Sequence, residues 1–271
     1  MAKLLNGAEL ADYVKERQAR QVRALRQAWK TFPKLVILMT PGATAASRAY
    51  VRMKQAYGED ILIDTDVRIV EQAALAQAIR EANADEAVHG IIVQLPLDDP
   101  AEMDEIVGLI APEKDVDGLS DGAHYDGATA EAINWLLTGY GIDLARKRIV
   151  IVGRGRLVGA PLEKMWRASD YDVTAVDDTT PGITSVVQAA HIIVTATGAP
   201  RLLTSTMIPV GAVVVDAGTA SEGGKLVGDV DPSVRERDDI TITPERGGVG
   251  PLTIATLFDH VIQAAQATIR D

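Results

Sequence analysis

The sequence predicts an α/β fold made of two domains, each with a largely parallel sheet. Segments with helical and extended patterns alternate along most of the 271 residues, and parallel strands require long crossover connections of this kind. A stretch rich in Gly, Asp and Ala at residues 117–129 interrupts the alternation and marks a boundary. Hydrophobic residues form 47% of the chain but aromatic residues only 4%, so mainly Ala, Val, Leu and Ile must fill the cores.

The part before the boundary starts with a long helix. Apolar residues recur at helical spacing over residues 9–29. The elements expected after it are a buried strand at 35–39, a helix at 45–57, a strand at 61–63, an amphipathic helix at 71–83, a buried strand at 88–93 and a short helix at 101–109.

The part after the boundary repeats the alternation with shorter elements. A helical pattern at 130–140 leads to an apolar strand at 148–152, which glycines follow at once. The elements expected next are a helix at 157–168, a strand at 172–176, a helix at 183–190, strands at 192–196 and 212–216, extended pieces at 226–231 and 240–243, and a final amphipathic helix at 253–269.

Composition and charge exclude several classes of function. The net charge is −11 without a basic face, which argues against nucleic acid as a partner. The Arg-rich stretch at residues 15–30 is best interpreted as the solvated face of a helix. No apolar run is long enough to span a membrane, and the absence of Cys excludes disulfides and thiolate metal sites. We therefore expect a cytoplasmic protein that acts on small molecules.

A glycine turn follows the apolar strand at 148–152. Gly153, Gly155 and Gly159 open the next helix, so the backbone can approach a pyrophosphate at a helix N-terminus. The spacing is one residue longer than the usual fingerprint, and a tight turn needs glycines in any case. The strand–turn–helix context nevertheless favours a dinucleotide site.

Two aspartates end the following strand. Asp177 and Asp178 lie where an acid usually binds the adenosine ribose, and a carboxylate there would favour NAD over NADP. Arg154 and Arg156 act in the opposite sense, because either can pair with a phosphate. The alternative is that the two aspartates are merely solvated in a turn.

Tyr50 and Lys54 lie four residues apart and share one face of the expected helix. A lysine desolvated between apolar walls loses its proton more readily and can serve as an acid or a base. Such a pair is common by chance, and taken alone it is more often part of the surface. Its position about a hundred residues before the glycine turn argues against a short-chain dehydrogenase.

Further polar candidates follow the strand at 88–93. Gln94 stands at its carboxyl end, where open α/β sheets bind ligands, or else caps its own loop. Asp115 and Asp117 are one residue apart, so one can face a ligand while the other holds the loop. A metal site is not expected, and His124 and His191 look isolated and structural.

Six short motifs occur in one order along nearly the whole chain, and together they are specific. In that order the sequence resembles the bifunctional methylenetetrahydrofolate dehydrogenase/methenyltetrahydrofolate cyclohydrolase family. The motifs are YVRMK (50–54), GIIVQLPL (90–97), KDVDG (114–118), VGAP (158–161), GDVD (228–231) and GGVGPLT (247–253).

The resemblance implies an architecture and a reaction. Residues 1–125, completed by a final helix at 252–271, would form a folate-binding domain, and residues 130–248 a Rossmann-type domain, with the substrate in a cleft between them. The enzyme would oxidise methylenetetrahydrofolate with NAD or NADP and hydrolyse the methenyl product to 10-formyltetrahydrofolate. Family members are usually homodimers.

The resemblance also implies roles for single residues. Lys54 matches the essential lysine, Tyr50 the tyrosine that stacks on the pterin, Gln94 the partner of the lysine and Asp117 the acid that holds the pterin edge. The further substrate-binding residues expected are Ser47, Leu95, Pro96, Gly248 and Pro251. The cofactor-binding residues expected are Gly153, Arg154, Gly155, Arg156, Val158, Gly159, Asp177, Thr197 and Thr219.

The departures from the family pattern cluster around the cofactor half. The segment YDGATAEAI (125–133) replaces a Pro-Cys-Thr-Pro-type loop, and Gly155 stands where Ser is usual. Asp177 and Asp178 replace a His-Ser pair, and residues 244–246 replace Pro-Val-Pro. A cyclohydrolase with weak or altered dehydrogenase activity is therefore the main alternative, and a non-catalytic folate- or nucleotide-binding protein is a distant one.

Overall fold

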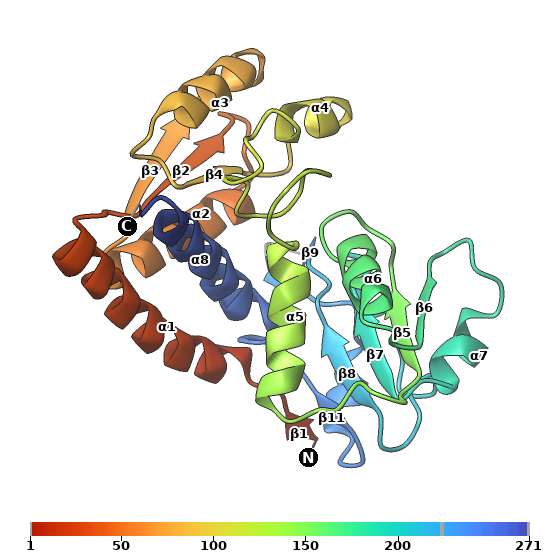
Figure 1. Cartoon of the computed structure of the whole chain (residues 1–271). Helices are drawn as coiled ribbons and strands as arrows, with labels where there is room; N and C mark the ends of the chain where they lie inside the picture. Colours follow the sequence, from red (N-terminus) through yellow and green to blue (C-terminus); the bar gives the residue numbers. More distant parts are fainter. Residues whose placement is uncertain (1, 223–224, 270–271) are drawn as a thin grey trace. The chain divides into compact units, whose positions relative to one another are not determined.

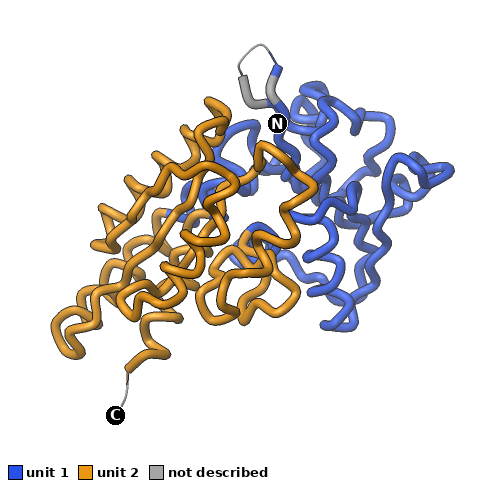
Figure 2. The backbone as a smooth tube through the Cα atoms, turned by 90° about the horizontal axis from the view of Figure 1, so that it is seen from above, with its two compact units in different colours: residues 1–11, 129–253 blue, residues 12–128, 254–271 orange. Residues whose placement is uncertain are grey.

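The computed structural model describes residues 2–222 and 225–269, and the chain divides into two compact units (Figure 2). Unit 1 comprises Met1–Ala11 and Thr129–Thr253, and unit 2 comprises Asp12–Ala128 and Ile254–Asp271. Both units combine parallel strands with helices, which confirms the predicted α/β class (Figure 1).

Unit 2 is built on a three-stranded parallel sheet in the order β3-β2-β4. Its strands are β2 (Lys34–Met39), β3 (Asp64–Ile69) and β4 (Gly90–Val93). Alternate residues of β2 face opposite sides, because side chains alternate across a strand. Leu35 and Ile37 join one buried cluster, and Val36 and Leu38 join the other.

Helices cover both faces of this sheet. On one face, α2 (Ala45–Asp60) and α8 (Val249–Ala267) pack with α1 (Gly7–Ala24) and a π-helical turn, η1 (Leu25–Trp29). Phe258 of α8 is fully buried there and stacks on Tyr57 of α2, with ring centroids 5.2 Å apart. On the other face lie α3 (Leu75–Ala84) and α4 (Met103–Val107), each preceded by a 3-10 turn, η2 (Gln72–Ala74) and η3 (Pro100–Glu102).

Unit 1 is built on a six-stranded parallel sheet in the order β1-β11-β8-β7-β5-β6. Its strands are β1 (Lys3–Leu4), β5 (Ile149–Val152), β6 (Val173–Val176), β7 (Ile192–Thr195), β8 (Val213–Asp216) and β11 (Thr241–Ile242). The helices of this unit are α5 (Ala128–Gly139), α6 (Gly159–Ala168), α7 (Ile183–Gln188) and the 3-10 turn η4 (Pro232–Glu236). The chain order reverses beside β5, which is the arrangement of dinucleotide-binding sheets.

Two short pieces of unit 1 differ from the sequence prediction: the strands at 3–4 and 220–222 were not expected, whereas the strand at 225–227 overlaps the extended piece expected at 226–231. Strand β1 pairs with β11 through Lys3↔Thr241, so the first eleven residues lie in unit 1 rather than with the domain that follows them. Strands β9 (Ala220–Glu222) and β10 (Lys225–Val227) form a separate antiparallel pair. Both elements are too short to show a periodic pattern in the sequence.

One predicted strand was wrong. Residues 61–63 lie in the turn before β3, where Ile61 and Ile63 are 0% and 2% exposed. Strand β3 itself reads DTDVRI and contains no fully buried residue, because it is an edge strand that pairs only with β2. The buried residues of this segment thus lie in the turn, whereas the strand itself is only partly buried.

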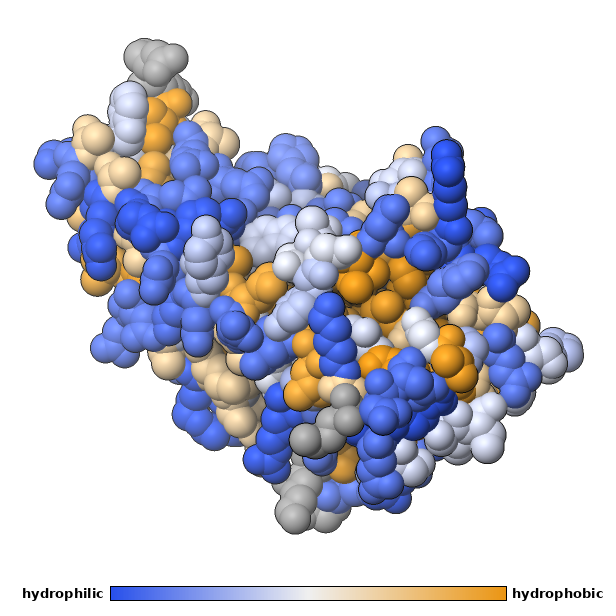
Figure 3. Space-filling model, turned by 90° about the horizontal axis from the view of Figure 1, so that it is seen from below, coloured by the Kyte–Doolittle hydropathy of each residue, from blue (hydrophilic) through white to orange (hydrophobic). Residues whose placement is uncertain are grey.

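The surface carries many hydrophilic side chains. Hydrophilic side chains cover much of the face shown in Figure 3, with hydrophobic side chains in separate patches. Among the described residues, no helix is long and apolar enough to cross a membrane.

Candidate active site

Lys54 is a buried cation in unit 2. Its side chain lies on α2 and the residue is only 3% exposed. The ammonium donates a hydrogen bond to Gln94 Oε1 at 3.1 Å and lies 5.1 Å from the centre of the Tyr50 ring. The structure therefore brings together three of the residues that the sequence singled out.

Local structure explains this meeting. Thr44 caps α2 by accepting from Ser47 N, and the helix then places positions 50 and 54 one turn apart on the same face. Gln94 follows β4, and its backbone N–H donates to Leu38 O near the end of β2. The side-chain amide of Gln94 donates to Leu95 O at 3.0 Å, which turns Oε1 toward Lys54.

The loop after β4 adds further expected residues. Ser47 is buried, and its hydroxyl donates to Leu95 O at 3.3 Å. Leu95 is partly buried, Pro96 is exposed, and a cis peptide bond joins them. Ser47 and Gln94 thus fix the same carbonyl group from two sides, so the loop is held next to Lys54.

Asp115 and Asp117 differ in their hydrogen bonds and in their burial. Asp115 is fully buried and accepts from the backbone N–H groups of Gly118, Leu119 and Ser120, which makes it the residue that shapes the loop. Asp117 is partly buried, and its carboxyl interacts electrostatically with Lys54. Asp117 is therefore the acid that remains available to a ligand.

The electrostatics of this cluster favour proton transfer. Burial lowers the pKa of Lys54, and the nearby Asp117 carboxylate opposes this shift. Burial likewise raises the pKa of Asp117, against the opposing effect of Lys54. Perturbed pKa values of this kind are typical of catalytic groups.

His260 is a site residue that the sequence analysis missed. It lies on α8 and is 2% exposed, and its Nδ1 lies 2.8 Å from Val116 O. Since a carbonyl oxygen only accepts, Nδ1 carries the proton. The ring also stacks on Tyr125 at a centroid distance of 4.7 Å. His260 thus supports the residue before Asp117, and no local sequence pattern announces a contact across 144 positions.

The glycine turn of unit 1 has the expected local structure. Gly153 has φ of 106°, and a Cβ built on it would lie 2.6 Å from Ala196 O. A Cβ on Gly159 would overlap the carbonyl oxygen of Gly153. Gly155 is exposed, with its nearest neighbour 3.9 Å from a built Cβ, so its surface is open to a ligand. Val158 precedes α6 as its N-cap.

Arg154 and Arg156 come after the carboxyl end of β5, and Asp177 comes after the carboxyl end of β6. Asp177 Oδ1 accepts from Thr179 and Thr180, and Oδ2 lies 3.8 Å from Arg154 Nη1. The hydrogen bond from the Thr179 hydroxyl is the main reason that the pKa of Asp177 is lowered. Arg154 also donates to Ala175 O at 2.7 Å, while Arg156 is partly buried on the turn.

Thr197 and Thr219 lie on the loops after β7 and β8. Thr197 is partly buried, and its N–H donates to Asp229 Oδ2 at 2.6 Å; Thr219 is exposed. Gly248 and Pro251 also belong to unit 1, at the start of α8, where Gly247 O accepts from Ala8 N. The expected site residues are thus divided between the two units, with Gly248 and Pro251 in the same unit as the residues expected to bind the cofactor.

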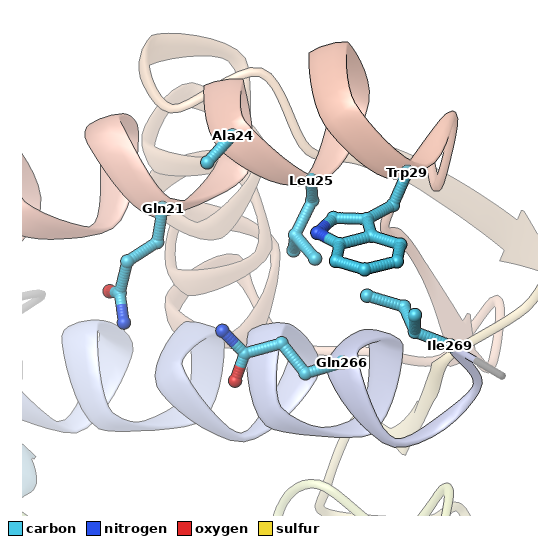
Figure 4. Close-up of a pocket in the computed structure, with 6 residues that line it drawn as sticks. All are labelled: Gln21, Ala24, Leu25, Trp29, Gln266 and Ile269. Atoms are coloured by element: carbon cyan, nitrogen blue, oxygen red, sulfur yellow. The ribbon is translucent and has the colours of Figure 1, made fainter. Parts of the chain in front are cut away.

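A pocket of about 360 Å³ lies elsewhere in unit 2, between the end of α1 with η1 on one side and the end of α8 on the other (Figure 4). Its lining residues are Gln21, Ala24, Leu25, Trp29, Gln266 and Ile269. None of these residues was expected in the site, and the lining holds no charged group. Among the described residues, no cluster of three or more His, Asp or Glu side chains comes together in a way that could hold a metal ion.

Fold and site together define a two-unit α/β protein of the dinucleotide-binding enzyme class. Residues 5–117 match the catalytic domain of the tetrahydrofolate dehydrogenase/cyclohydrolase family, and residues 127–269 match its NAD(P)-binding domain. The chain therefore belongs to the tetrahydrofolate dehydrogenase/cyclohydrolase family.

Relatives support this assignment over the full length. The bifunctional protein FolD of Exiguobacterium sibiricum is 34% identical over 98% of this chain and all of its own. The structure of the FolD enzyme of Campylobacter jejuni matches with a TM-score of 0.92 at 33% identity, covering 98% of this chain and 99% of the other. The FolD structure of Trypanosoma brucei, complexed with NADP and an inhibitor, matches with a TM-score of 0.93 at 30% identity, covering 100% and 99%.

Proposed function

We propose that this chain oxidises methylenetetrahydrofolate with NAD(P) and hydrolyses the methenyl product to 10-formyltetrahydrofolate. The observation that carries the proposal is the buried Lys54 ammonium, which Gln94 holds at 3.1 Å beside Asp117. Mere binding of a folate has no use for a desolvated lysine with a lowered pKa. The alternative, a cyclohydrolase with weak or altered dehydrogenase activity, is not favoured by the relatives, since residues 127–269 match the NAD(P)-binding domain of the family.

Tyr50, Asp117 and the loop around Leu95 bind the folate. The Tyr50 ring is partly exposed and offers a flat surface for a pterin ring. The pterin edge presents adjacent N–H donors, and the Asp117 carboxylate presents two acceptors. Ser47 and Gln94 both donate to Leu95 O and so hold this loop beside Lys54.

Lys54 acts as the base in hydrolysis. Because burial lowers its pKa, a larger fraction of Lys54 is neutral at physiological pH than of an exposed lysine. As water adds to the methenyl carbon, a C–O bond forms and Lys54 Nζ takes the proton, directly or through a second water. A ring C–N bond then breaks: its electron pair returns to the ring nitrogen, which takes up a proton, while the added oxygen loses its remaining proton and becomes the carbonyl of the formyl group. Gln94 orients Nζ throughout.

Unit 1 binds the cofactor on its glycine turn. The open surface of Gly155 and the crowded backbone at Gly153 and Gly159 fit a cradle in which backbone N–H groups approach a pyrophosphate. When bound, NAD(P) supplies the acceptor for the electron pair that leaves the one-carbon bridge. Thr197, Thr219 and the loops around them orient the nicotinamide end.

Within this function, NAD is the preferred cofactor. Asp177 stands at the end of β6 with a lowered pKa, so it is a carboxylate at neutral pH and repels a 2′-phosphate. Arg154 is engaged with Ala175 O and lies near Asp177, which reduces its capacity to bind that phosphate.

Parallel assays test the whole proposal. The purified protein is given methylenetetrahydrofolate with NAD and with NADP, and methenyltetrahydrofolate hydrolysis is followed separately. Both reactions should proceed. Hydrolysis without oxidation by either cofactor would reduce the chain to a cyclohydrolase, and failure of both reactions would leave only binding.

The cofactor preference has its own test. Wild-type kcat/KM should be higher with NAD than with NADP, and D177S should shift the ratio toward NADP by about tenfold, since one repulsive charge is removed. The matched control is D178S, because Asp178 is exposed on the neighbouring position. Equal or better wild-type turnover with NADP contradicts the preference, as does a D177S ratio equal to that of D178S.

The assembly in this proposal is a homodimer formed through unit 1 and located in the cytoplasm, as the resemblance and the composition led us to expect. Light scattering after gel filtration should give twice the chain mass of 28.9 kDa. A monomeric mass in an active preparation contradicts the homodimer.

A further inference from the structure

The motif GDVD contains a buried acid to which the function above assigns no task. Asp229 is 0% exposed, and its Oδ2 accepts from the Thr195 hydroxyl at 2.7 Å and from Thr197 N at 2.6 Å. Thr195 ends β7, and Thr197 belongs to the loop that follows. A single carboxylate oxygen thus fixes the point where this strand becomes a loop.

The fixed loop lies directly against the glycine turn. A Cβ built on Gly153 would lie 2.6 Å from Ala196 O and 3.1 Å from Thr197 Cγ2. Gly198 continues the loop with φ of 69°, near Thr219 O. Displacement of Thr197 would therefore alter the wall beside the glycine turn.

Asp229 is in turn held from behind. Its backbone N–H donates to Asp216 Oδ1 at 3.0 Å, and Asp216 Oδ2 pairs with Arg235 at 2.8 Å. Gly218 closes over the carboxylate, because a Cβ built on it would overlap the Asp229 carboxyl group. This support restricts the positions open to the side chain.

Asp229 uses only one of its two carboxyl oxygens within the part of the chain that the structure describes. Asp229 Oδ1 is buried and has no hydrogen-bond partner among the residues that the structure describes. A buried polar atom without a partner is costly. Such a cost is tolerated where a group serves function rather than stability.

We infer that Asp229 is a positioning residue for the dehydrogenase reaction: it holds Thr197 and Gly198 in the conformation that receives the nicotinamide end of NAD(P). The inference rests on the proposed function of unit 1. Asp229 acts through the loop, without touching the reacting atoms. It should therefore affect cofactor binding while methenyl hydrolysis, which depends on Lys54 in unit 2, stays unchanged.

The test compares three variants of the full chain. D229A removes the acceptor and should raise the KM for NAD(P) about tenfold or more, since Thr197 N loses a bond to a charged group. D229N keeps one acceptor oxygen and should bring the KM back to within about threefold of wild type. The matched control from the same motif is D231A: Asp231 caps η4 through Ser233 N at 2.9 Å, so its loss affects local stability but not the KM.

The measurements distinguish failure of the positioning role of Asp229 from failure of the proposed function. Binding of NAD and NADP is titrated by calorimetry alongside the kinetics, and thermal unfolding is recorded for every variant. Absence of binding by the wild type would contradict the proposed function itself, whereas equal binding by wild type and D229A overturns only this inference. A D231A variant whose KM rises as much as that of D229A overturns it too. If D229A does not fold, T195V, which removes one donor to the same oxygen, must raise the KM about twofold to threefold; an unchanged KM in T195V overturns the inference.

Discussion

The two groups of site residues are built by different means. In unit 2 the site consists of side chains: the buried Lys54 ammonium on α2, the Gln94 amide directly after β4, and the Asp117 carboxyl on a loop. In unit 1 the site consists mostly of backbone: the glycine turn, and the loop after β7 that the buried Asp229 holds. In the proposed function, the site of unit 2 depends on its functional groups, and the site of unit 1 depends on the space that its backbone leaves for the cofactor.

The difference determines how each site responds to change. A side-chain site loses function when one functional group is replaced, while the fold around it remains. A backbone site loses function when an atom is added, because the path of the chain itself is the binding surface. Four predictions follow this contrast in order of decreasing effect.

Lys54→Met should have the largest effect. Methenyl hydrolysis should fall by about 10² to 10⁴-fold, the usual contribution of a general base, while part of the dehydrogenase activity remains. Because the methionine fills a similar buried volume, the fold should be retained, and denaturant unfolding measures the cost of leaving Gln94 Oε1 without this donor. Full hydrolysis by this variant would remove Lys54 from the mechanism.

Gly159→Ala should damage the backbone site. The new Cβ overlaps Gly153 O, so the start of α6 must move, and the KM for NAD(P) should rise at least about tenfold with some loss of stability. Gly155→Ala provides the comparison, because its Cβ meets nothing closer than 3.9 Å within the chain. It should raise the KM without lowering the melting temperature. Hydrolysis should persist in both variants, and its loss in either would contradict the separation of the two sites.

Asp117→Asn should move the pH dependence of hydrolysis. Hydrolysis is lost as the pH falls through the pKa of Lys54, because the protonated amine is no base. The Asp117 carboxylate raises that pKa against the effect of burial, so removing its charge lowers the pKa further. The pH of half-maximal activity should therefore decrease, alongside weaker folate binding. Asp121→Asn, an exposed change in the same loop, should leave the profile unchanged, and a shift upward in D117N refutes the coupling.

His260→Leu should have the smallest effect. It leaves the oxygen of the fully buried Val116 without its donor, which should lower the free energy of unfolding by about 1–3 kcal/mol. A rise of a few fold in the KM for folate should accompany it, since Val116 precedes Asp117. His124→Leu is the control, because His124 is exposed in the neighbouring loop and should change stability by less than about 0.5 kcal/mol. Equal stability of the two variants would contradict the supporting role of His260.

The difference between a side-chain site and a backbone site also determines how much of each could be predicted from the sequence. Lys54, Tyr50 and Gln94 carry distinctive chemistry at positions that helix and strand periodicity places on one side of a sheet, and the structure brings them together. The role of Asp115 was one of two alternatives for that loop, and only its bonds to three backbone N–H groups identify it as the residue that holds the loop. His260 and Asp229 act across 144 and 32 positions, and no local pattern encodes such contacts. Strand β1 escaped notice because two residues have no period.

The chain passes between the two units at residues 11–12, 128–129 and 253–254. The third crossing lies inside α8. Residues of α8 after this crossing, such as Leu257 and Phe258, belong to the buried cluster on one face of β2. Consequently the cofactor module cannot be exchanged between homologues as a simple cassette of residues 129–248. A gene fragment ending near residue 128 would encode a substrate module without its central core helix, and a working chimera must graft both termini together with the segment between them.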